Sequence, residues 1–406
     1  MSMRSLIIIP LLALAAACGS DNGPNGPPAI VGATLVSAGW DGTCAIGGSG
    51  GLACWGAAPT GTDADTGAGA DLLGALSIPT PIDLIALSLD RDFAPGTGCA
   101  VGSTGQAYCW GAIYQSDVGQ SIGAGIQPLS GFTSMGSIAL GQHVVCGTRT
   151  DKTVRCAGWY TGGGRGIDSI GDPDAFDLTP NTLKPATSVF GTSIGQQFGC
   201  ALRADSLAVC WGRRDGGRLG GATGDSLQNC GAESPAWCQP GPAPVAGGQK
   251  YRVVSVGGAS ACAVRIDGGV DCWGQKKGVA ITGMSGLQCQ PSDACLYTPT
   301  AIAVPGTAIR VGVGRDHACA LITTGDVYCW GDNAFGQLGR PGAASLIPVK
   351  VSGGYAFVSL SVGAYHTCAI EAGSGAVGCW GANSTGQLGD GTTTDRSSPV
   401  AVVVAE

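Results

Sequence analysis

The chain has 406 residues, of which only 12% are charged, and its formal net charge is −7. It contains 72 glycines and 22 prolines, a composition that favours turns and short strands over long helices. No cluster of lysine and arginine supplies the basic surface that grips phosphate backbones, so we expect no nucleic-acid partner. Because the chain is longer than one compact core usually allows, internal repeats are the first feature to seek.

The first 17 residues have the features of an export signal. Arg4 precedes an apolar run from Leu6 to Ala17, which is too short to cross a bilayer but typical of a signal-peptide core. The run ends in Leu14-Ala15-Ala16-Ala17-Cys18-Gly19. This segment resembles a bacterial lipobox, in which cleavage leaves an N-terminal cysteine that carries lipid. We therefore predict that residues 1–17 are a lipoprotein signal peptide and that Cys18 is the lipidation site.

One departure from the lipobox leaves an alternative open. Leu14 lies four residues before the cysteine, where the motif usually places it three before, so ordinary cleavage after Ala-X-Ala could remove Cys18. Residues 18–29 are rich in Ser, Asn, Asp, Gly and Pro and cannot bury apolar area, which predicts a flexible tether. Gly19 after the cysteine resembles lipoproteins sorted to the outer membrane, and this resemblance implies an anchored position in the cell envelope.

Beyond Cys18, the cysteines fall into couples with hairpin spacing. Seven couples are ten or eleven positions apart: Cys44 with Cys54, Cys99 with Cys109, Cys146 with Cys156, Cys200 with Cys210, Cys262 with Cys272, Cys319 with Cys329, and Cys368 with Cys379. Two further couples are local: Cys230 with Cys238, and Cys289 with Cys295. Every cysteine except Cys18 therefore has a neighbour, and this pattern predicts disulfides and an oxidising compartment.

The unit around Cys319 explains the spacing. Apolar segments 317–321 and 327–331 flank the turn residues Thr323–Asp326, which predicts a β-hairpin. Counting outward from the turn places Cys319 opposite Cys329, and directly opposed residues on antiparallel strands lie close enough for a disulfide.

Metal sites are not predicted, and neither is a cofactor. Zinc is the competing ligand for paired cysteines, but the chain contains only three histidines: His143, His317 and His366. Two cysteines in each hairpin cannot make seven four-ligand sites with so few histidines. The insertion Ala57–Pro79 contains three acidic residues: Asp63, Asp65 and Asp71. Their spacing does not match the helix-loop-helix calcium loop, so we interpret them as a solvated acidic loop.

The same order of segments recurs around the cysteine couples. A short β segment such as Val358–Gly363 precedes the cysteine hairpin, Trp-Gly follows it, and the fullest copies continue with Gly-Gln-Leu-Gly and a Pro-Val strand. Repeats of roughly fifty residues with several short strands are typical of propeller blades, because one blade cannot bury both of its faces alone. The sequence predicts an all-β, seven-bladed β-propeller with disulfide-rich hairpins over residues 30–406.

The two ends of the repeat region are expected to close the ring. Ser398–Val404 is a Pro-Val strand with no cysteine hairpin after it, and Ala33–Gly39 begins the first unit without a Pro-Val strand of its own. We expect the N- and C-terminal strands to close the ring and to share one blade, because closure removes open sheet edges.

The last repeat carries a family resemblance. Its segments His366-Thr367-Cys368-Ala369-Ile370, Cys379-Trp380-Gly381-Ala382-Asn383 and Gly386-Gln387-Leu388-Gly389 resemble the bacterial branch of the regulator of chromosome condensation repeat family. The resemblance extends over nearly all of residues 30–406 and is strongest in the last two units. It implies a seven-bladed propeller and no particular ligand.

Residues that repeat are interpreted as architecture, and residues that break the repeat as candidates for function. Each tryptophan after a cysteine is expected to pack between blades, and His317 and His366 are interpreted as repeat residues with a hydrogen-bonding role. Two insertions at equivalent positions of adjacent units, Ala222–Pro242 with Trp237 and Gly283–Pro299 with Tyr297, are candidates for a binding patch. The alternative is that they are stapled surface loops.

No motif of an enzyme is present: the chain has no Gly-X-Ser-X-Gly, no His-Glu-X-X-His and no phosphate loop. We predict an extracytoplasmic, lipid-anchored, monomeric binding module that uses a propeller face to bind another envelope or extracellular protein. Its membrane contact is expected through the lipid anchor. Two alternatives remain: a carbohydrate-binding or carbohydrate-cleaving envelope propeller, and a passive structural protein of the cell surface.

Overall fold

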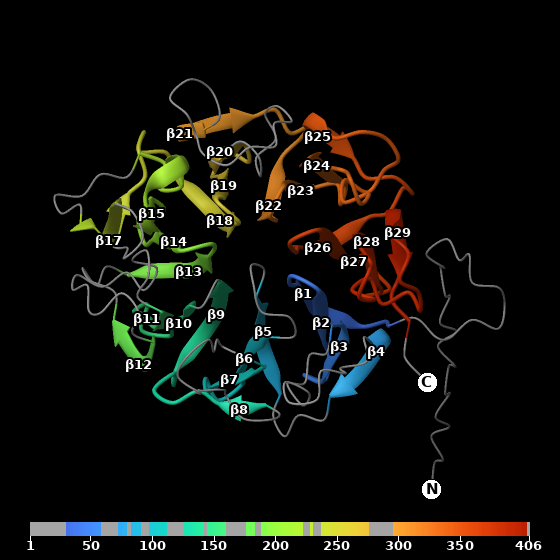
Figure 1. Ribbon diagram of the computed structural model, residues 1–406, viewed down its shortest axis with the longest axis horizontal. Helices are drawn as coiled ribbons and strands as arrows, with labels where there is room; N and C mark the ends of the chain where they lie inside the picture. Colours follow the sequence, from blue (N-terminus) through green and yellow to red (C-terminus); the bar gives the residue numbers. More distant parts are fainter. Residues whose placement is uncertain are drawn as a thin grey trace, which may run out of the picture.

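The computed structural model describes residues 30–57, 72–78, 83–90, 97–111, 126–141, 144–159, 176–182, 188–221, 228–229, 237–275 and 295–403. These residues form seven antiparallel sheets arranged as a ring around a central axis (Figure 1). One short 3₁₀ turn, η2 (Asp215–Gly217), interrupts the strands of this described part. The prediction of an all-β, seven-bladed propeller is confirmed.

Each sheet is one blade. The first strand of a blade lies nearest the axis, and the following strands lie successively farther out (Figure 1). Blade 1 comprises β1 (Ala33–Ala38), β2 (Gly42–Gly47), β3 (Leu52–Gly56) and β4 (Leu72–Ile78). Blade 2 comprises β5 (Leu84–Leu89), β6 (Gly98–Gly102), β7 (Ala107–Trp110) and β8 (Gln127–Pro128). Blade 3 comprises β9 (Met135–Gly141), β10 (Val144–Arg149), β11 (Val154–Trp159) and β12 (Phe176–Thr182).

Blade 4 has a fifth strand, β16, paired outside β17. It comprises β13 (Val189–Ile194), β14 (Phe198–Arg203), β15 (Ala208–Arg213), β16 (Gln228–Asn229) and β17 (Trp237–Pro244). Blade 5 comprises β18 (Tyr251–Gly257), β19 (Ser260–Arg265), β20 (Val270–Gln275) and β21 (Cys295–Ile302). Blade 6 comprises β22 (Ala308–Val313), β23 (His317–Ile322), β24 (Val327–Gly331) and β25 (Ser345–Lys350). Blade 7 comprises β26 (Phe357–Val362), β27 (His366–Glu371), β28 (Val377–Gly381) and β29 (Arg396–Ala401).

The second and third strands of every blade form the cysteine hairpin. In each hairpin the register places the two cysteines directly opposite each other, as Cys319 opposite Cys329 in blade 6. The side chains of these cysteines are fully buried. The extra residue of the last couple lies in the β27–β28 turn and leaves the pairing of Cys368 with Cys379 intact.

All seven hairpins contain the disulfide that the spacing predicts. From blade 1 to blade 7 the bonds join Cys44 to Cys54, Cys99 to Cys109, Cys146 to Cys156, Cys200 to Cys210, Cys262 to Cys272, Cys319 to Cys329, and Cys368 to Cys379. The structure therefore agrees with the sequence on the partner of each of these fourteen cysteines. Every bond ties the second strand of a blade to the third.

A backbone hydrogen bond joins every blade to the next. The first residue of each innermost strand donates its N–H to a carbonyl in the hairpin turn of the preceding blade, as Phe357 does to Gly325 at 2.8 Å. The turn residue has a positive φ in every case, and a Cβ at Gly325 would lie 3.1 Å from the Ala356 backbone. Glycine supplies this conformation at little cost, whereas Lys152 and Ser206 adopt it at two of the seven seams.

The same bond closes the ring. Ala33 donates to the carbonyl of Gly375 at 3.0 Å, and Ile30 donates to Val402 at 2.9 Å, so the two ends of the repeat region meet between blades 7 and 1. The expectation that both ends share one blade is wrong, because β29 pairs with β28 and no sheet in the described part contains strands from both ends. Each repeat unit runs from its innermost strand to its own Pro-Val strand, so each unit is a complete blade.

Serine hydroxyls add a second bond at five seams. The fifth residue of an innermost strand is serine, and its hydroxyl accepts the N–H of the sixth residue in the next blade, as Ser361 does from Ala38 at 2.9 Å. The other four bonds start from Ser37, Ser88, Ser193 and Ser255. Blade 3 has Ala139 at this position. Blade 6 has Gly312, where a Cβ would lie 2.5 Å from the Val362 side chain.

The tryptophans after the third-strand cysteines fill the spaces between blades, as predicted. Six of them are at most 1% exposed: Trp55, Trp110, Trp211, Trp273, Trp330 and Trp380. The Gly-Gln-Leu-Gly segment of the preceding blade completes the contact, because Trp380 donates its Nε1–H to the carbonyl of Gln337 at 3.1 Å. At the closing seam, Trp55 packs in one buried cluster with Leu388.

The serine bond at the closing seam can be tested by substitution. We expect Ser361→Ala to lower the free energy of unfolding by about 1 kcal/mol, the usual contribution of one such hydrogen bond. Ala139→Ser should stabilise the protein, because it supplies the missing acceptor for Ile194 between blades 3 and 4. Denaturant unfolding with the disulfides intact measures both effects. Ser359→Ala, on the same strand, is the matched control and should change stability by less than about 0.5 kcal/mol. Equal losses for Ser359→Ala and Ser361→Ala would contradict the assignment.

Candidate functional site

The four-strand order gives the ring two different faces. Connections between the first and second strands and between the third and fourth strands open on one face, which we call the loop face. The hairpin turns and the connections from blade to blade open on the opposite face, which we call the hairpin face. The strands that flank each long insertion of the sequence are the third and the fourth of a blade, whose connected ends lie on the loop face.

The two insertions singled out by the sequence lie on this loop face in adjacent blades. One joins β15 to β17 in blade 4 and the other joins β20 to β21 in blade 5, so their equivalent positions are confirmed. Tyr297 lies in β21 and is 56% exposed. The blade 4 loop approaches it closely, since a Cβ at Gly217 would lie 3.1 Å from the Tyr297 Cα. Trp237 begins β17.

Most of both insertions, residues 222–227, 230–236 and 276–294, lies outside the described residues. A shared patch of Trp237 and Tyr297 therefore stays a prediction. Cys238 and Cys295 are disulfide-bonded, and their predicted partners, Cys230 and Cys289, also lie outside the described residues. So do the signal peptide, the lipidation site Cys18 and the tether predicted over residues 1–29.

Peptide mapping without reduction tests the cysteine pattern. We expect the seven hairpin disulfides together with Cys230–Cys238 and Cys289–Cys295, because hairpin neighbours are already within bonding range. The mass of the alkylated chain should reveal no free thiol, since the sulfur of Cys18 is expected to carry lipid. A peptide linking Cys230 to Cys289, or many alkylated thiols in protein purified under oxidising conditions, would contradict the pairing.

A second cluster on the loop face was not anticipated from the sequence. Arg315 places its guanidinium carbon 4.9 Å from the centre of the Trp40 ring and 5.7 Å from that of Tyr365. Tyr365 meets Trp40 edge-on at 5.5 Å and Phe335 edge-on at 5.6 Å. We call these four residues, which come from blades 1, 6 and 7, the aromatic–arginine cluster.

The seams between these blades position the cluster. The N–H of Arg315 bonds to the carbonyl of Ala364 at 3.1 Å, and the N–H of Ala364 bonds to Gly39 at 2.9 Å. These links bring the first–second strand connections of blades 6, 7 and 1 side by side. Trp40 and Arg315 occupy equivalent positions, each directly after the repeated glycine, Gly39 or Gly314. An alignment of the repeats at this position would have shown that these two residues differ from blade to blade.

The surroundings of the cluster are charged. Burial raises the pKa of the Tyr365 hydroxyl, Arg315 opposes the rise, and the carboxylates of Asp316, Asp41 and Asp332 add to it. Arg315 is exposed, and within the described part of the chain its guanidinium makes no hydrogen bond or ion pair and contacts the two rings alone. The two rings therefore hold the guanidinium by cation–π contact and leave its N–H groups available.

His317 and His366 lie in the interior and form hydrogen bonds between blades, in keeping with their predicted structural role. The Nε2 atom of His366 lies 2.7 Å from the hydroxyl of Thr43, and that of His317 lies 2.9 Å from the hydroxyl of Thr367. Thr43 donates its proton to the carbonyl of Gln387 at 3.0 Å. The hydroxyl therefore accepts from His366, which assigns the proton of this neutral imidazole to Nε2.

Acid is expected to weaken these seams. Burial lowers the pKa of both His317 and His366 to about 3 from an ordinary 6.5, and in His317 the charge of His366 adds to the effect. The folded state then binds fewer protons than the unfolded chain below pH 6.5. The stabilisation is complete above pH 6.5 and is lost as the pH falls toward 3, by about 1.4 kcal/mol per pH unit for each histidine.

Denaturant unfolding between pH 6.5 and 5 measures this slope. The variant His366→Gln should have a lower free energy of unfolding at neutral pH. Its free energy of unfolding should also change less steeply with pH, by about 1.4 kcal/mol per pH unit, because one titrating histidine has been removed. His143, which precedes its cysteine by one more residue and lies outside the described part, supplies the control His143→Gln. A slope unchanged in His366→Gln would refute the role of the buried imidazole.

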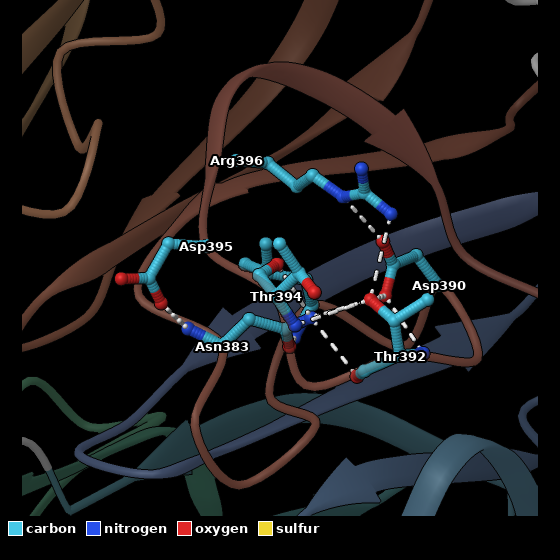
Figure 2. A network of polar contacts seen from close by, with 7 residues as sticks. Asn383, Asp390, Thr392, Thr394, Asp395 and Arg396 are labelled. Carbon is cyan, nitrogen blue, oxygen red and sulfur yellow. Dashed lines mark hydrogen bonds and ion pairs between the residues drawn. The ribbon is translucent and has the colours of Figure 1, made fainter.

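A polar network fixes the third–fourth strand loop of blade 7 (Figure 2). Asn383 is fully buried and donates from its Nδ2 to the carbonyls of Thr392 and Thr394 at 3.0 and 3.1 Å. Its backbone N–H donates to Asp395 at 2.7 Å, while Asp390 pairs with Arg396 at 2.7 Å. These contacts hold the Gly-Gln-Leu-Gly loop against blade 1, so we assign the network to structure.

The described residues include a small cavity that a missing side chain explains. A cavity of about 10 Å³ lies between blades 1 and 2, lined by Gly39, Trp40, Gly42, Thr43, Cys44, Ala57, Leu89, Asp90 and Thr97. Gly42 occupies the place that His317 and His366 take in their blades, so the cavity is the volume of a missing side chain and suits one water molecule. No group of three or more metal-ligating side chains occurs in this part. Asp63, Asp65 and Asp71 lie outside it.

Comparison with known proteins identifies the repeat. Residues 324–370 and residues 308–337 match the regulator of chromosome condensation (RCC1) repeat. Both matched segments lie in blades 6 and 7. The chain is 28% identical over 230 residues to the human probable E3 ubiquitin-protein ligase HERC4, and it spans 20% of that protein. It is 29% identical over 245 residues to the Arabidopsis thaliana ultraviolet-B receptor UVR8 and spans 52% of it.

Solved structures show the same fold. Human WBSCR16 aligns with a TM-score of 0.68 at 15% identity, over 87% of this chain and 91% of that one. Saccharomyces cerevisiae Prp20p aligns with a TM-score of 0.52 at 17% identity, over 91% and 76% of the two chains. The ectodomain of the Arabidopsis thaliana receptor kinase ACR4 aligns with a TM-score of 0.52 at 19% identity, over 92% and 99%.

The matched segments and the solved structures together show a propeller fold with segments similar to the RCC1 repeat in blades 6 and 7. The similarity to HERC4 lies within the propeller, so ligase chemistry is a property of that larger protein. Seven buried disulfides indicate an oxidising, extracellular location. Within the described part, no helix is long and apolar enough to span a membrane.

Proposed function

We propose that this chain is an exported, lipid-anchored binding module that holds a protein partner on its loop face through the aromatic–arginine cluster. One observation carries the proposal: Trp40, Tyr365, Phe335 and Arg315 gather at the surface from three blades. Tryptophan, tyrosine and arginine are the residues enriched at the energetic centres of protein interfaces.

The cluster favours a partner that presents a carboxylate beside an apolar side chain. The guanidinium of Arg315 already lies over the rings of Trp40 and Tyr365, so its positive charge would repel a second cation placed there. Its N–H edge instead suits a bidentate carboxylate, such as that of an aspartate or glutamate. Phe335 is 40% exposed beside Tyr365 and provides apolar contact area at the edge of the same site.

Rigid support makes the side chains of the cluster suitable for binding. The strands beneath them are tied by buried disulfides and by hydrogen bonds from blade to blade, so little conformational entropy is left to lose when a partner binds. Tyr297, and Trp237 if it lies close by, would extend the same face across blades 4 and 5.

The export part of the proposal comes from the N-terminal sequence. The signal core Leu6–Ala17 and the lipobox-like segment ending at Cys18 support an anchor in the cell envelope. The buried disulfides suit that compartment, and a similar propeller forms the ectodomain of a receptor kinase.

Crosslinking capture from intact cells tests the binding site. Trp40→Ala combined with Arg315→Gln should reduce recovery of the partner at least tenfold, because it removes the stacked pair at the centre of the cluster. Arg315→Lys alone should give an intermediate loss, since lysine keeps the charge but not the two-pronged geometry. Tyr297→Ser measures the contribution of the blade 5 insertion separately.

The control is Phe190→Ala, which removes an exposed aromatic residue from the hairpin face and should leave capture unchanged. Unfolding curves of all variants must coincide with that of the native chain. Undiminished capture by the double variant Trp40→Ala with Arg315→Gln would overturn the site. If the native chain captures a glycan and no protein, the carbohydrate-binding alternative replaces the proposal.

A further inference from the structure

Within the described residues, the hairpin face carries five of the nine large apolar side chains that are exposed. These five residues are between 47% and 66% exposed: Val31, Ile85, Phe190, Ile266 and Val358. They come from five different blades or their entry segments, so they are distributed around the axis and do not form one patch. An extended flat apolar surface can contact all five side chains at once. A protein partner that binds at one compact site would contact only one or two of them.

Backbone contacts fix their position on this face. Ile85 and Val358 are the second residues of β5 and β26, directly after the residue that bonds to a hairpin turn of the preceding blade. Ile266 lies in the β19–β20 turn. Phe190 lies under the ammonium group of Lys152, which is 5.0 Å from the ring centre.

The same face has an excess of unpaired cations. Within the described residues, Lys152, Lys250, Arg252 and Arg310 are exposed and make no ion pair. The other basic side chains are compensated by acids: Arg149 by Asp151, Arg203 by Asp205, Arg265 by Asp267 and Asp271, and Lys350 by Asp326. Two further acids, Asp83 and Glu371, also lie here. The named groups of this face, eight basic and seven acidic, thus sum to +1, whereas the chain as a whole has a net charge of −7.

The described chain enters the ring at this face. Ile30 bonds to Val402 beyond the end of the last strand, and Gly32 bonds to Ser374 in the β27–β28 turn. Eleven residues, 19–29, separate Ile30 from Cys18. Even fully extended they reach about 40 Å, so a lipid on Cys18 stays within that distance of the hairpin face, where the chain enters the ring.

We propose that the hairpin face rests on a lipid bilayer with anionic headgroups. Lys152, Lys250, Arg252 and Arg310 contact the headgroups, and the apolar side chains reach the boundary of the acyl region. This proposal rests on the anchor of the proposed function for its orientation. It extends the membrane contact from the anchor to the propeller and turns the aromatic–arginine cluster away from the membrane.

Two phenylalanines on opposite faces allow a matched test. The full, lipidated chain is reconstituted into vesicles of phosphatidylethanolamine and phosphatidylglycerol, with the photocrosslinker p-benzoylphenylalanine in place of either Phe190 or Phe335. These side chains are 47% and 40% exposed, so their access to a crosslinking target is comparable. We expect lipid adducts from position 190 at a yield at least tenfold above that from position 335.

Charge variants test the electrostatic part. Lys250→Gln with Arg310→Gln on the hairpin face should lower the lipid-adduct yield at position 190 about fivefold or more, because each cation near an anionic surface contributes to binding. Arg214→Gln with Arg340→Gln removes the same charge from the loop face and should change the yield less than twofold. Replacing phosphatidylglycerol with a zwitterionic lipid should have the effect of the first pair.

Equal yields from the two positions, a higher yield at 335, or no adduct at either would overturn the proposal. Protein adducts at position 190 in intact cells, in place of lipid adducts, would assign this face to a protein partner and would also overturn it. The mass of the N-terminal peptide reports lipidation of Cys18, and partner capture reports the loop-face site. Failure of either part of the proposed function is therefore distinguishable from failure of the membrane-facing orientation.

Discussion

The hydrogen bond from each innermost strand to the hairpin turn of the preceding blade is the contact on which the ring depends. It occurs at all seven seams, including the closing one between Ala33 and Gly375. A single blade exposes both sheet faces to water and gains little from folding alone. Neighbouring blades bury those faces, with a tryptophan wedged at six seams. The bond aligns each blade so that this packing is possible, and it requires a positive φ in the turn, which glycine adopts most readily.

Much of this architecture could be predicted from the sequence because its signals are local. Cysteines ten residues apart around a turn allow one register, and that register is the one found. The serine bonds could not be found in this way, because Ser361 looks like any polar residue of a half-buried strand until its partner, Ala38, is known. The aromatic–arginine cluster is harder still. Residues 40 and 365 become neighbours only when the ring closes, and no local pattern encodes that closure. The prediction that the two ends share one blade was wrong for a related reason. The sequence shows the order of the strands within a repeat, but it does not show at which strand of the repeat a blade begins.

An even number of main strands in every blade separates the molecule into two surfaces with different freedom to vary. Hairpin turns are short because the disulfide behind them fixes both strands, and their carbonyls are needed at the seams. Connections after the third strand do not supply these carbonyls and do not join two disulfide-bonded strands. The sequence can therefore carry insertions there without disturbing the disulfide-bonded strands. The proposed division of labour follows from this asymmetry. A constrained face with exposed apolar and cationic side chains suits a uniform lipid surface, and a variable face suits a specific partner.

The aromatic–arginine cluster lies over the seams between blades 6, 7 and 1, and two of those seams contain a buried histidine bonded to a threonine. Tyr365 lies directly before His366 in the chain, and Arg315 lies two residues before His317. The hydrogen bonds of these neutral imidazoles therefore hold the backbone that carries the cluster. A protonated imidazole at either position is disfavoured by burial, and the charge of one opposes the charge of the other. Conditions acidic enough to protonate them would loosen the seams that align Trp40 with Arg315 before they affected the disulfide-bonded hairpins. The stability of the ring and the geometry of its candidate binding site are therefore coupled through the same two side chains.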